Sequence, residues 1–360
     1  MKKILSLLLV LVMLMSLCAC GKTAEPAATN APAVEAPAPN APAEAPTEEN
    51  SLGEPVNLIV SLTAAENADY SEGIRAAKEY IETTSNGNIT LEVYYNAALF
   101  TQEEELTATA MGDCDITVTG PTWVAANSPW ANCFGGFLFK NYEHMDAVLN
   151  GDIGARAFQT IAEEQNFLPL GAWYYGARQV SLSKDKEVKT PEDLKGINLR
   201  MPNSEAWLFL GNALGANATP MSFSELYLAL QTGAVDGQDN PLPTVESAKF
   251  YEVQECIIMT NHQVDSVWPV INMDKWNSMT EAQQQIVRDG MNVGRLKNDE
   301  LTLTAEAELV AFFESEGLKI HYPDVDAFKS HIMECYMNDP ISDSWDKDMV
   351  AEIEALGANY

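Results

Sequence analysis

The chain has 360 residues, of which 46% are hydrophobic, so it is too apolar for a disordered polyelectrolyte and long enough for two modest domains. Its 52 Asp and Glu residues outnumber its 21 Lys and Arg residues, which gives a formal net charge of -31. This charge argues against binding to nucleic-acid phosphates or, through a basic patch, to anionic lipid. A buried site for a small anion stays possible, because such a site responds mainly to its nearest cations and dipoles.

The N-terminus has the pattern of a bacterial secretory signal. Lys2 and Lys3 precede an apolar run over residues 4–17, which is shorter than the roughly 20 residues that span a bilayer. The run ends in Leu17-Cys18-Ala19-Cys20-Gly21, which resembles the lipobox of bacterial lipoproteins. We therefore predict a signal peptide over residues 1–19 and lipidation of Cys20, the first mature residue. A plain signal peptide cut near Ala19 is the alternative.

The next segment, residues 20–51, has the composition of a spacer. Residues 21–50 contain ten Ala and six Pro, and Val34 is the only large aliphatic residue among them. No hydrophobic core can form from such a sequence. Frequent proline favours extended polyproline structure of about 3.1 Å per residue, so the segment could reach about 90 Å at most. We interpret it as a lipid-anchored Ala/Pro-rich tether, with low-complexity filler as the alternative.

The globular part begins with an alternation of strand and helix patterns. Period-two alternation predicts strands over residues 56–62 and 89–95, and a third strand follows at 115–119. Helical spacing predicts helices over residues 70–85 and 102–111 between them. This βαβαβ order predicts a mostly parallel sheet with helices on both faces, and a ligand site at the carboxyl ends of the strands.

A second α/β unit follows. Strands are predicted at residues 168–174, 197–201 and 218–221. Three helices are also predicted: one that begins at Pro191, a second that ends at Leu214 and a third over residues 224–232. The capping box that starts at Thr280 opens the longest helical stretch, which ends near Glu316. We infer an α/β protein with two lobes, a ligand cleft between them and one long helix that spans both. The assigned boundaries are 52–175 plus about 266–305 for lobe I, and 176–265 plus about 306–360 for lobe II.

Motifs of catalysis or metal binding are absent from the sequence. There is no G-x-S-x-G elbow, phosphate-binding loop or H-E-x-x-H pair, and the four histidines lack ligand spacing. We therefore predict no enzyme activity, no metal and no cofactor. Residues 236–240 carry two carboxylates but lack the length of a calcium loop, which favours a turn. Four further cysteines, Cys114, Cys133, Cys256 and Cys335, could form disulfides in three different pairings. We favour free thiols instead.

Two of the six arginines stand apart from the others. Arg75, Arg156, Arg288 and Arg295 lie in polar helical patterns, where a solvated face is the default interpretation. Arg178 and Arg200 each lie by a strand-like segment instead. A strand-end arginine in an α/β lobe points toward the ligand crevice, and its planar guanidinium can hold a carboxylate through two parallel hydrogen bonds. A structural ion pair is the alternative for both.

The sequence around Arg200 resembles the signature of a transporter family. The segments are Lys195-Gly196-Ile197-Asn198-Leu199-Arg200-Met201-Pro202-Asn203 and Pro220-Met221-Ser222-Phe223, followed by Gln238-Asp239-Asn240-Pro241. They are similar to the extracytoplasmic solute receptors of tripartite ATP-independent periplasmic (TRAP) transporters, the C4-dicarboxylate and sialic-acid receptor family. The similarity extends from about Val56 to the C-terminus and is strongest from Arg178 to His262.

The resemblance implies several roles in ligand binding. Arg200 matches the family arginine that forms a bidentate salt bridge with the ligand carboxylate, and Arg178 matches a second arginine of the pocket. Asn240 matches an asparagine that bonds ligand oxygens. Phe223 and Trp268 are expected as aromatic walls of the pocket, with an ordinary core position as the alternative. Asn203 and Thr63 are expected as polar contacts.

The same resemblance implies the function. We expect a lipid-anchored, extracytoplasmic receptor that binds a small organic acid, a C4-dicarboxylate or a sugar acid, and delivers it to a sodium-coupled TRAP permease. Residues 97–100 and 120–121 depart from the family pattern, and the latter replace a glutamate of the sialic-acid receptors, which disfavours sialic acid itself. The alternatives are a receptor of an ATP-driven importer, an enzyme on the same scaffold and an adhesion lipoprotein.

Overall fold

One path of hydrogen-bonded strands organises residues 52–360, the part of the chain that the computed structural model describes. The predicted signal peptide, Cys20 and the tether lie outside the described residues. The strand order is β2-β1-β3-β9-β5-β8-β6-β7, and β4 and β10 also pair with β9. The strands are β1 (Val56–Ser61), β2 (Ile89–Tyr94), β3 (Ile116–Thr119), β4 (Phe167–Pro169), β5 (Trp173–Leu182), β6 (Asn198–Met201), β7 (Asn217–Pro220), β8 (Gly237–Pro241), β9 (Cys256–Asn272) and β10 (Lys319–His321).

The first half of the sheet follows the predicted βαβαβ order. Strand β1 lies parallel to both β2 and β3, and the connections are α1 (Asp69–Thr84) and α2 (Gln102–Met111). Helix α2 begins with a capping box between Thr101 and Glu104, and it ends at Gly112, whose φ of 82° lies in the left-handed region that glycine adopts without strain. These local signals explain why the prediction for this half is confirmed.

The second half repeats the parallel arrangement around β6. Strand β6 lies parallel to β7 and β8, with α6 (Glu205–Ala213) and α7 (Leu226–Thr232) as connections. Two predictions here were wrong. The helix expected from Pro191 is a single 3-10 turn, η2 (Pro191–Leu194). The turn expected at residues 236–240 is the buried strand β8, because these polar residues pair with β5 on one side and with β6 on the other.

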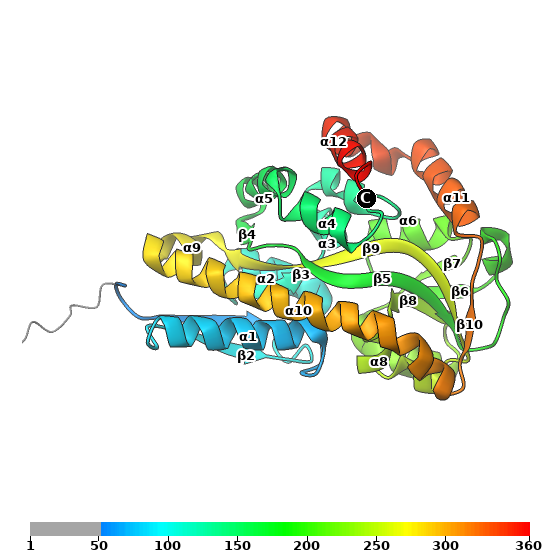
Figure 1. Ribbon diagram of the computed structural model, residues 1–360, viewed down its shortest axis with the longest axis horizontal. Helices are drawn as coiled ribbons and strands as arrows, with labels where there is room; N and C mark the ends of the chain where they lie inside the picture. Colours follow the sequence, from blue (N-terminus) through cyan, green and yellow to red (C-terminus); the bar gives the residue numbers. More distant parts are fainter. Residues whose placement is uncertain (1–51) are drawn as a thin grey trace, which may run out of the picture. The chain divides into compact units, whose positions relative to one another are not determined.

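Two long strands, β5 and β9, join the halves. Strand β9 has 17 residues and pairs antiparallel with β3, β4 and β5, while β5 pairs antiparallel with β8. Both run through the middle of the molecule in Figure 1. The sheet is therefore mixed, which corrects the mostly parallel prediction. Arg178 lies in the middle of β5, not at a strand end as expected.

The long helix α10 (Glu281–Ser315) confirms the prediction from the capping box at Thr280. It packs along α1 and then against α8 (Leu242–Ser247), so it runs past both halves of the sheet (Figure 1). The contact with α1 is close because two glycines meet there. A Cβ at Gly294 would lie 2.6 Å from the Gly73 carbonyl oxygen. The helix thus fixes the two halves along one edge.

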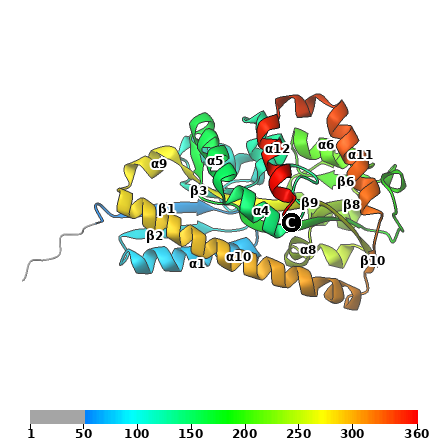
Figure 2. The same ribbon diagram turned by 45° about the horizontal axis from the view of Figure 1, so that its top comes forward.

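Helices cover both faces of the sheet, as predicted. Figures 1 and 2 show α1, α8 and α10 on one side of the sheet. On the other side, α12 packs against α4, and α11 packs against α6. The remaining helical bounds are α3 (Pro121–Val124), η1 (Pro129–Phe134), α4 (Tyr142–Leu149), α5 (Asp152–Gln165), η3 (Phe223–Glu225), η4 (Phe250–Val253), α9 (Met273–Ser278), α11 (Val325–Asn338), η5 (Pro340–Ser344) and α12 (Lys347–Gly357).

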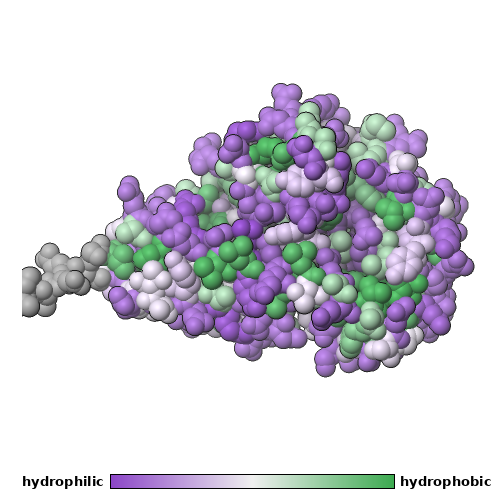
Figure 3. Space-filling model, viewed as in Figure 1, coloured by the Kyte–Doolittle hydropathy of each residue, from purple (hydrophilic) through white to green (hydrophobic). Residues whose placement is uncertain are grey.

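The buried side chains of the described part of the chain form four hydrophobic clusters between these layers. The face seen in Figure 3 is mostly hydrophilic with small scattered apolar groups, which fits the acidic composition. Within residues 52–360, no helix combines the length and the apolar character needed to cross a bilayer. The four cysteines of this part are free thiols.

Candidate ligand-binding cleft

Two adjoining cavities of about 590 and 670 Å³ open where the carboxyl ends of β1, β3, β6 and β8 meet. They form one cleft, because they share five lining residues, Thr63, Tyr70, Gln102, Tyr175 and Phe223. This position follows the rule that ligands of α/β proteins bind at the carboxyl ends of the strands. The cleft is therefore the candidate site.

Five of the seven predicted contact residues line this cleft. Thr63 follows β1, Arg178 lies on β5, Arg200 on β6, Phe223 begins η3, and Asn240 lies on β8. They come from segments up to 177 residues apart in the chain, from Thr63 to Asn240. The topology of the sheet brings them together, as the family resemblance implied.

The other two predicted residues lie elsewhere. Trp268 is fully buried in a hydrophobic cluster, where it packs edge-on against Phe134 and Phe158. Successive residues of a strand point to opposite faces, so Val267 lines the cleft while Trp268 faces the core. Asn203 is exposed and lines a separate surface cavity beside α6 and α11. Neither residue forms a wall or contact of the cleft.

Arg200 is a buried cation without a carboxylate partner. The residue is 1% exposed, its Nε donates to the Met221 carbonyl oxygen at 2.9 Å, and its Nη2 is buried with no hydrogen-bond partner. Among residues 52–360, no carboxylate lies within 4.0 Å of its guanidinium. Burial lowers the pKa of Arg200 to about 10, so the group is still a cation at neutral pH.

Arg178 lines the same cleft, but its guanidinium is occupied by the protein. Its Nε donates to Asp239 Oδ2 at 2.8 Å, its Nη1 donates to Asp265 Oδ2 at 2.8 Å, and its Nη2 donates to Asn240 Oδ1 at 3.2 Å. Burial disfavours this charge, but the two carboxylates outweigh the cost and raise the pKa of Arg178. All three nitrogens thus have partners before a ligand arrives.

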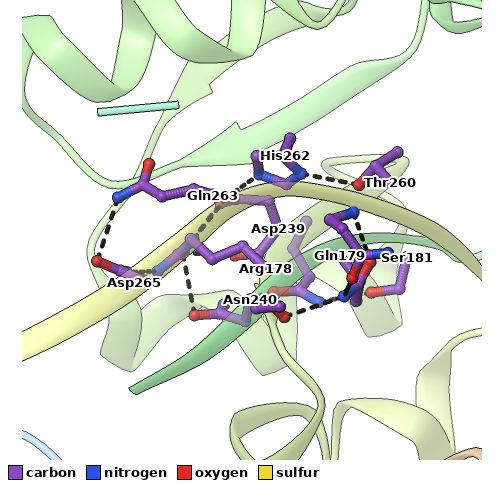
Figure 4. A network of polar contacts seen from close by, with 12 residues as sticks. Arg178, Gln179, Ser181, Asp239, Asn240, Thr260, His262, Gln263 and Asp265 are labelled. Carbon is purple, nitrogen blue, oxygen red and sulfur yellow. Dashed lines mark hydrogen bonds and ion pairs between the residues drawn. The ribbon is translucent and has the colours of Figure 1, made fainter. Parts of the chain in front are cut away.

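A buried polar network surrounds Arg178 (Figure 4). Asp239 accepts from Arg178 and lies 3.1 Å from His262 Nε2, and His262 Nδ1 lies 2.8 Å from the Thr260 hydroxyl. Burial alone would raise the pKa of Asp239, yet Arg178 and His262 lower it well below its usual range. Asn240 is held through Arg178 and Gln238, so the network fixes the amide that faces the cleft.

Trp207 is a cleft residue that the sequence analysis missed. Its indole ring lies 4.2 Å from the Arg178 guanidinium, and its Nε1 is buried without a hydrogen-bond partner. An unpaired indole N–H is costly to bury, so a hydrogen bond from it to a ligand oxygen would be favourable. Its place on the buried face of α6 follows from helical spacing, but the spacing alone could not separate cleft from core.

Glu105 is a second missed residue, and it lies on the other half of the sheet. This α2 carboxyl is 3% exposed, and it accepts hydrogen bonds from Ser61 Oγ at 3.0 Å and Thr63 Oγ1 at 2.7 Å. Burial raises its pKa to about 8, although the hydroxyls oppose this shift. The three acidic residues at 103–105 look like the negative charges that are common in the first turn of a helix. However, Glu105 lies three and four residues before the buried Ala108 and Thr109, and this helical spacing indicates that it points inward.

Comparison with known proteins identifies the family of this chain. Residues 60–339 match the profile described as bacterial extracellular solute-binding protein, family 7. The chain is 32% identical to the sialic acid-binding periplasmic protein SiaP of Vibrio cholerae over 79% of this chain and 89% of that protein. Two solved TRAP periplasmic solute binding proteins of Roseobacter denitrificans also resemble it.

The first of these structures holds 3-deoxy-D-manno-oct-2-ulosonic acid; it is 38% identical, has a TM-score of 0.81, and the match covers 84% of this chain and 100% of that one. The second holds L-galactonate; it is 28% identical, with a TM-score of 0.77 over 84% and 99% of the two chains. The extent of these matches, together with the cleft, shows that the chain belongs to family 7 of the bacterial extracellular solute-binding proteins, the receptors of TRAP transporters.

Proposed function

We propose that this receptor binds a small organic acid with the ligand carboxylate on Arg200. The observation that carries the proposal is the buried guanidinium, whose Nη2 has no partner and which has no carboxylate within reach among residues 52–360. Leaving a buried cation unpaired is costly, so a ligand carboxylate would relieve a cost that the empty cleft carries. Charge-assisted, two-point hydrogen bonding would also fix the orientation of the acid.

The other cleft residues would complete the site around that carboxylate. Trp207 Nε1 supplies a second unpaired donor, and Asn240 presents an amide held in place by Arg178. The Phe223 ring lies 6.0 Å from the Arg200 guanidinium carbon and would shield the ion pair from water. Arg178 therefore acts by positioning Asn240 and by its field. Thr63 provides a hydroxyl on the opposite half of the sheet.

The relatives support an organic acid as the ligand class. The two Roseobacter structures hold an ulosonic acid and an aldonic acid, each with one carboxylate and several hydroxyls. A 2,3-diketo-L-gulonate-binding protein of Escherichia coli is also similar to this chain, at 29% identity. A hydroxylated acid of about six to eight carbons fits these precedents. No bond of the ligand would be broken in this role.

Delivery to a membrane permease requires the receptor to close around its ligand. We place the lobes at 52–175 plus about 266–305 and at 176–265 plus about 306–360, so that the cleft lies between them. The hydrogen bonds from Ser222 Oγ to the Glu103 carboxylate, at 2.7 and 2.8 Å, would join the lobes across the cleft. Ligand contacts made by both lobes favour the closed form, which a sodium-coupled TRAP permease would recognise.

Attachment to the membrane would come from the N-terminal lipid on Cys20, with the tether as spacer. The test is a Cys20→Ser variant expressed with labelled palmitate. The wild-type receptor should carry the label and sediment with membranes, and the variant should do neither. Equal labelling of both would place the lipid elsewhere or rule it out.

The ligand assignment is tested by a thermal-shift screen of the purified receptor with organic acids and the corresponding amides. A ligand at 100 times its dissociation constant should add about 2.7 kcal/mol of stability. We expect acids to raise the melting temperature and their amides to leave it unchanged. Stabilisation by an acid and its amide alike would contradict a carboxylate-specific site.

A further inference from the structure

The charges that line the cleft are unequal, and they restrict its ligand further than a single arginine does. Among the described residues, the two cavities are lined by two cations, Arg178 and Arg200, and by three carboxyl groups, Asp69, Glu105 and Asp265. No lysine or histidine lines either cavity. Any anionic group of a ligand must therefore be matched by one of the two arginines.

Only one of these two arginines has a hydrogen-bond donor left for a ligand. Arg178 is held by Asp239 and Asp265, so its charge is already matched by carboxylates of the protein. Of the two arginines, only Arg200 has a buried guanidinium nitrogen without a hydrogen-bond partner among the described residues. The cleft can therefore neutralise one carboxylate, and a second would be buried without a counter-ion.

The side of the cleft formed by α1 and α2 carries hydrogen-bonding groups suited to hydroxyls. Glu105 lies in the second cavity, where its carboxyl already meets the hydroxyls of Ser61 and Thr63. Asp69 lies in the first cavity, where its Oδ2 accepts from Thr302 at 3.2 Å. Neither acid forms a salt bridge within residues 52–360. Both can accept hydrogen bonds from a polyol chain.

We propose that this cleft selects a polyhydroxylated monocarboxylate, and rejects dicarboxylates, because Arg200 is its one free cation among residues 52–360 and Glu105 binds the hydroxylated tail of the ligand. The proposal rests on the proposed function, since it presumes that the carboxylate lies on Arg200. It narrows the ligand from organic acids in general to sugar acids with a single charge. It also gives Glu105 a role as a specificity-determining residue.

Burial supports this role for Glu105. A carboxyl that is 3% exposed and has no cation beside it is favoured in its neutral form, in which it both donates and accepts hydrogen bonds. The titratable neighbours that sense it are the Tyr70 phenol and the Cys114 thiol, which are also neutral at pH 7. A ligand hydroxyl can pair with such a group in either sense, whereas a ligand carboxylate would gain no ion pair there.

The test compares acids that differ in one group. Aldonates such as L-galactonate are titrated beside their own aldarates, in which the terminal CH2OH has become a carboxylate, together with 3-deoxy-D-manno-oct-2-ulosonic acid, succinate and malate. We expect a polyhydroxylated monoacid to bind best and its aldarate to bind at least about 100-fold more weakly, because an unpaired buried charge costs several kcal/mol. A dicarboxylate that binds best, or an aldarate within tenfold of its aldonate, would overturn the proposal.

Variants of Glu105 test the tail contact. Glu105→Met should weaken the best monoacid by about 10-fold or more, since a ligand hydroxyl loses its partner, and Glu105→Gln should stay within about threefold. Wild-type affinity in Glu105→Met would refute the contact. The comparison of aldonate with aldarate in the wild type decides the proposal even where the Met variant does not fold.

Different results would contradict the carboxylate site on Arg200 and the selection by charge and by Glu105. If no acid of the panel binds the wild type, or if Arg200→Ala binds acids as well as the wild type does, the proposed carboxylate site is wrong. If acids bind in an Arg200-dependent way but aldonates and aldarates bind equally, only the selection by charge and by Glu105 is wrong.

Discussion

Arg178 and Arg200 line the same cleft, but Arg178 Nη1 lies 2.8 Å from the Asp265 carboxylate while Arg200 Nη2 is buried with no partner. Two arginines that look alike in the sequence therefore have different tasks. The first is part of the structure of the empty protein, and the second is left for a ligand. This difference defines the experiments that separate stability from binding.

Replacing Arg178 is expected to destabilise the protein. Arg178→Met leaves the buried carboxylates of Asp239 and Asp265 without their cation, which should cost about 3–5 kcal/mol. Chemical unfolding measures this change. The matched control is Arg156→Met, since Arg156 forms an exposed ion pair with Glu352 and should contribute less than about 1 kcal/mol. Equal effects of the two substitutions would show that the buried network is not the source of stability.

Glu105 is expected to make stability fall with rising pH. Burial raises the pKa of Glu105 from 4.5 to about 8, so between these values the folded protein holds a proton that the unfolded chain releases. Its contribution is complete below pH 4.5 and is lost as pH rises through 8, by at most about 1.4 kcal/mol per pH unit. Tyr70 and Cys114 stay protonated over this window.

The measurement compares ligand-free wild type with Glu105→Gln, which cannot titrate, by unfolding at several pH values from 5 to 8. The wild type should lose stability relative to the variant at each step upward. Parallel curves for the two proteins would mean that Glu105 is ionised in the folded state.

Trp207 is expected to contribute a hydrogen bond to the ligand. Trp207→Phe keeps an aromatic ring beside Arg178 but removes the Nε1 donor, which is buried without a partner. Loss of one hydrogen bond should weaken the best acid by about 2- to 13-fold, which calorimetry resolves. Unchanged affinity would show that the indole N–H does not meet the ligand.

The contact between α1 and α10 is expected to reject any side chain at Gly294. An added Cβ would lie 2.6 Å from the Gly73 carbonyl oxygen and 2.7 Å from the Trp173 ring. Although alanine favours a helix, overpacking of this kind costs about 1–3 kcal/mol, so Gly294→Ala should lower the unfolding free energy. Lys297→Ala on the exposed face of α10 is the control. A Gly294→Ala variant as stable as wild type would show that the helices move apart freely.

Local signals explain which parts of the fold could be predicted from the sequence. The capping box at Thr280 predicted the start of α10, and Gly112 predicted the end of α2. Such signals can be recognised in the sequence because they act within a few residues. Strand β9 was missed because its 17 residues are buried almost throughout and carry no alternation. Strand β8 was missed because its polar residues are stabilised by partners far away in the chain.

The site could be predicted in part for the same reason. Family resemblance placed Arg200, Arg178 and Asn240 in the cleft, but it could not show that Asp239 and Asp265 occupy Arg178. Those carboxylates come from β8 and β9, two strands that the sequence pattern did not predict. The charge balance of the cleft, on which the choice of ligand depends, became visible only in three dimensions.

The central claim is that Arg200 binds the carboxylate of the ligand. Its most direct test is calorimetric titration of wild type, Arg200→Ala and the surface variant Arg156→Ala with the best acid of the panel. Loss of one partner of a buried charge pair costs about 2–5 kcal/mol, so Arg200→Ala should bind at least about 30-fold more weakly, while Arg156→Ala binds as the wild type does. Wild-type affinity in a folded Arg200→Ala variant would contradict the account.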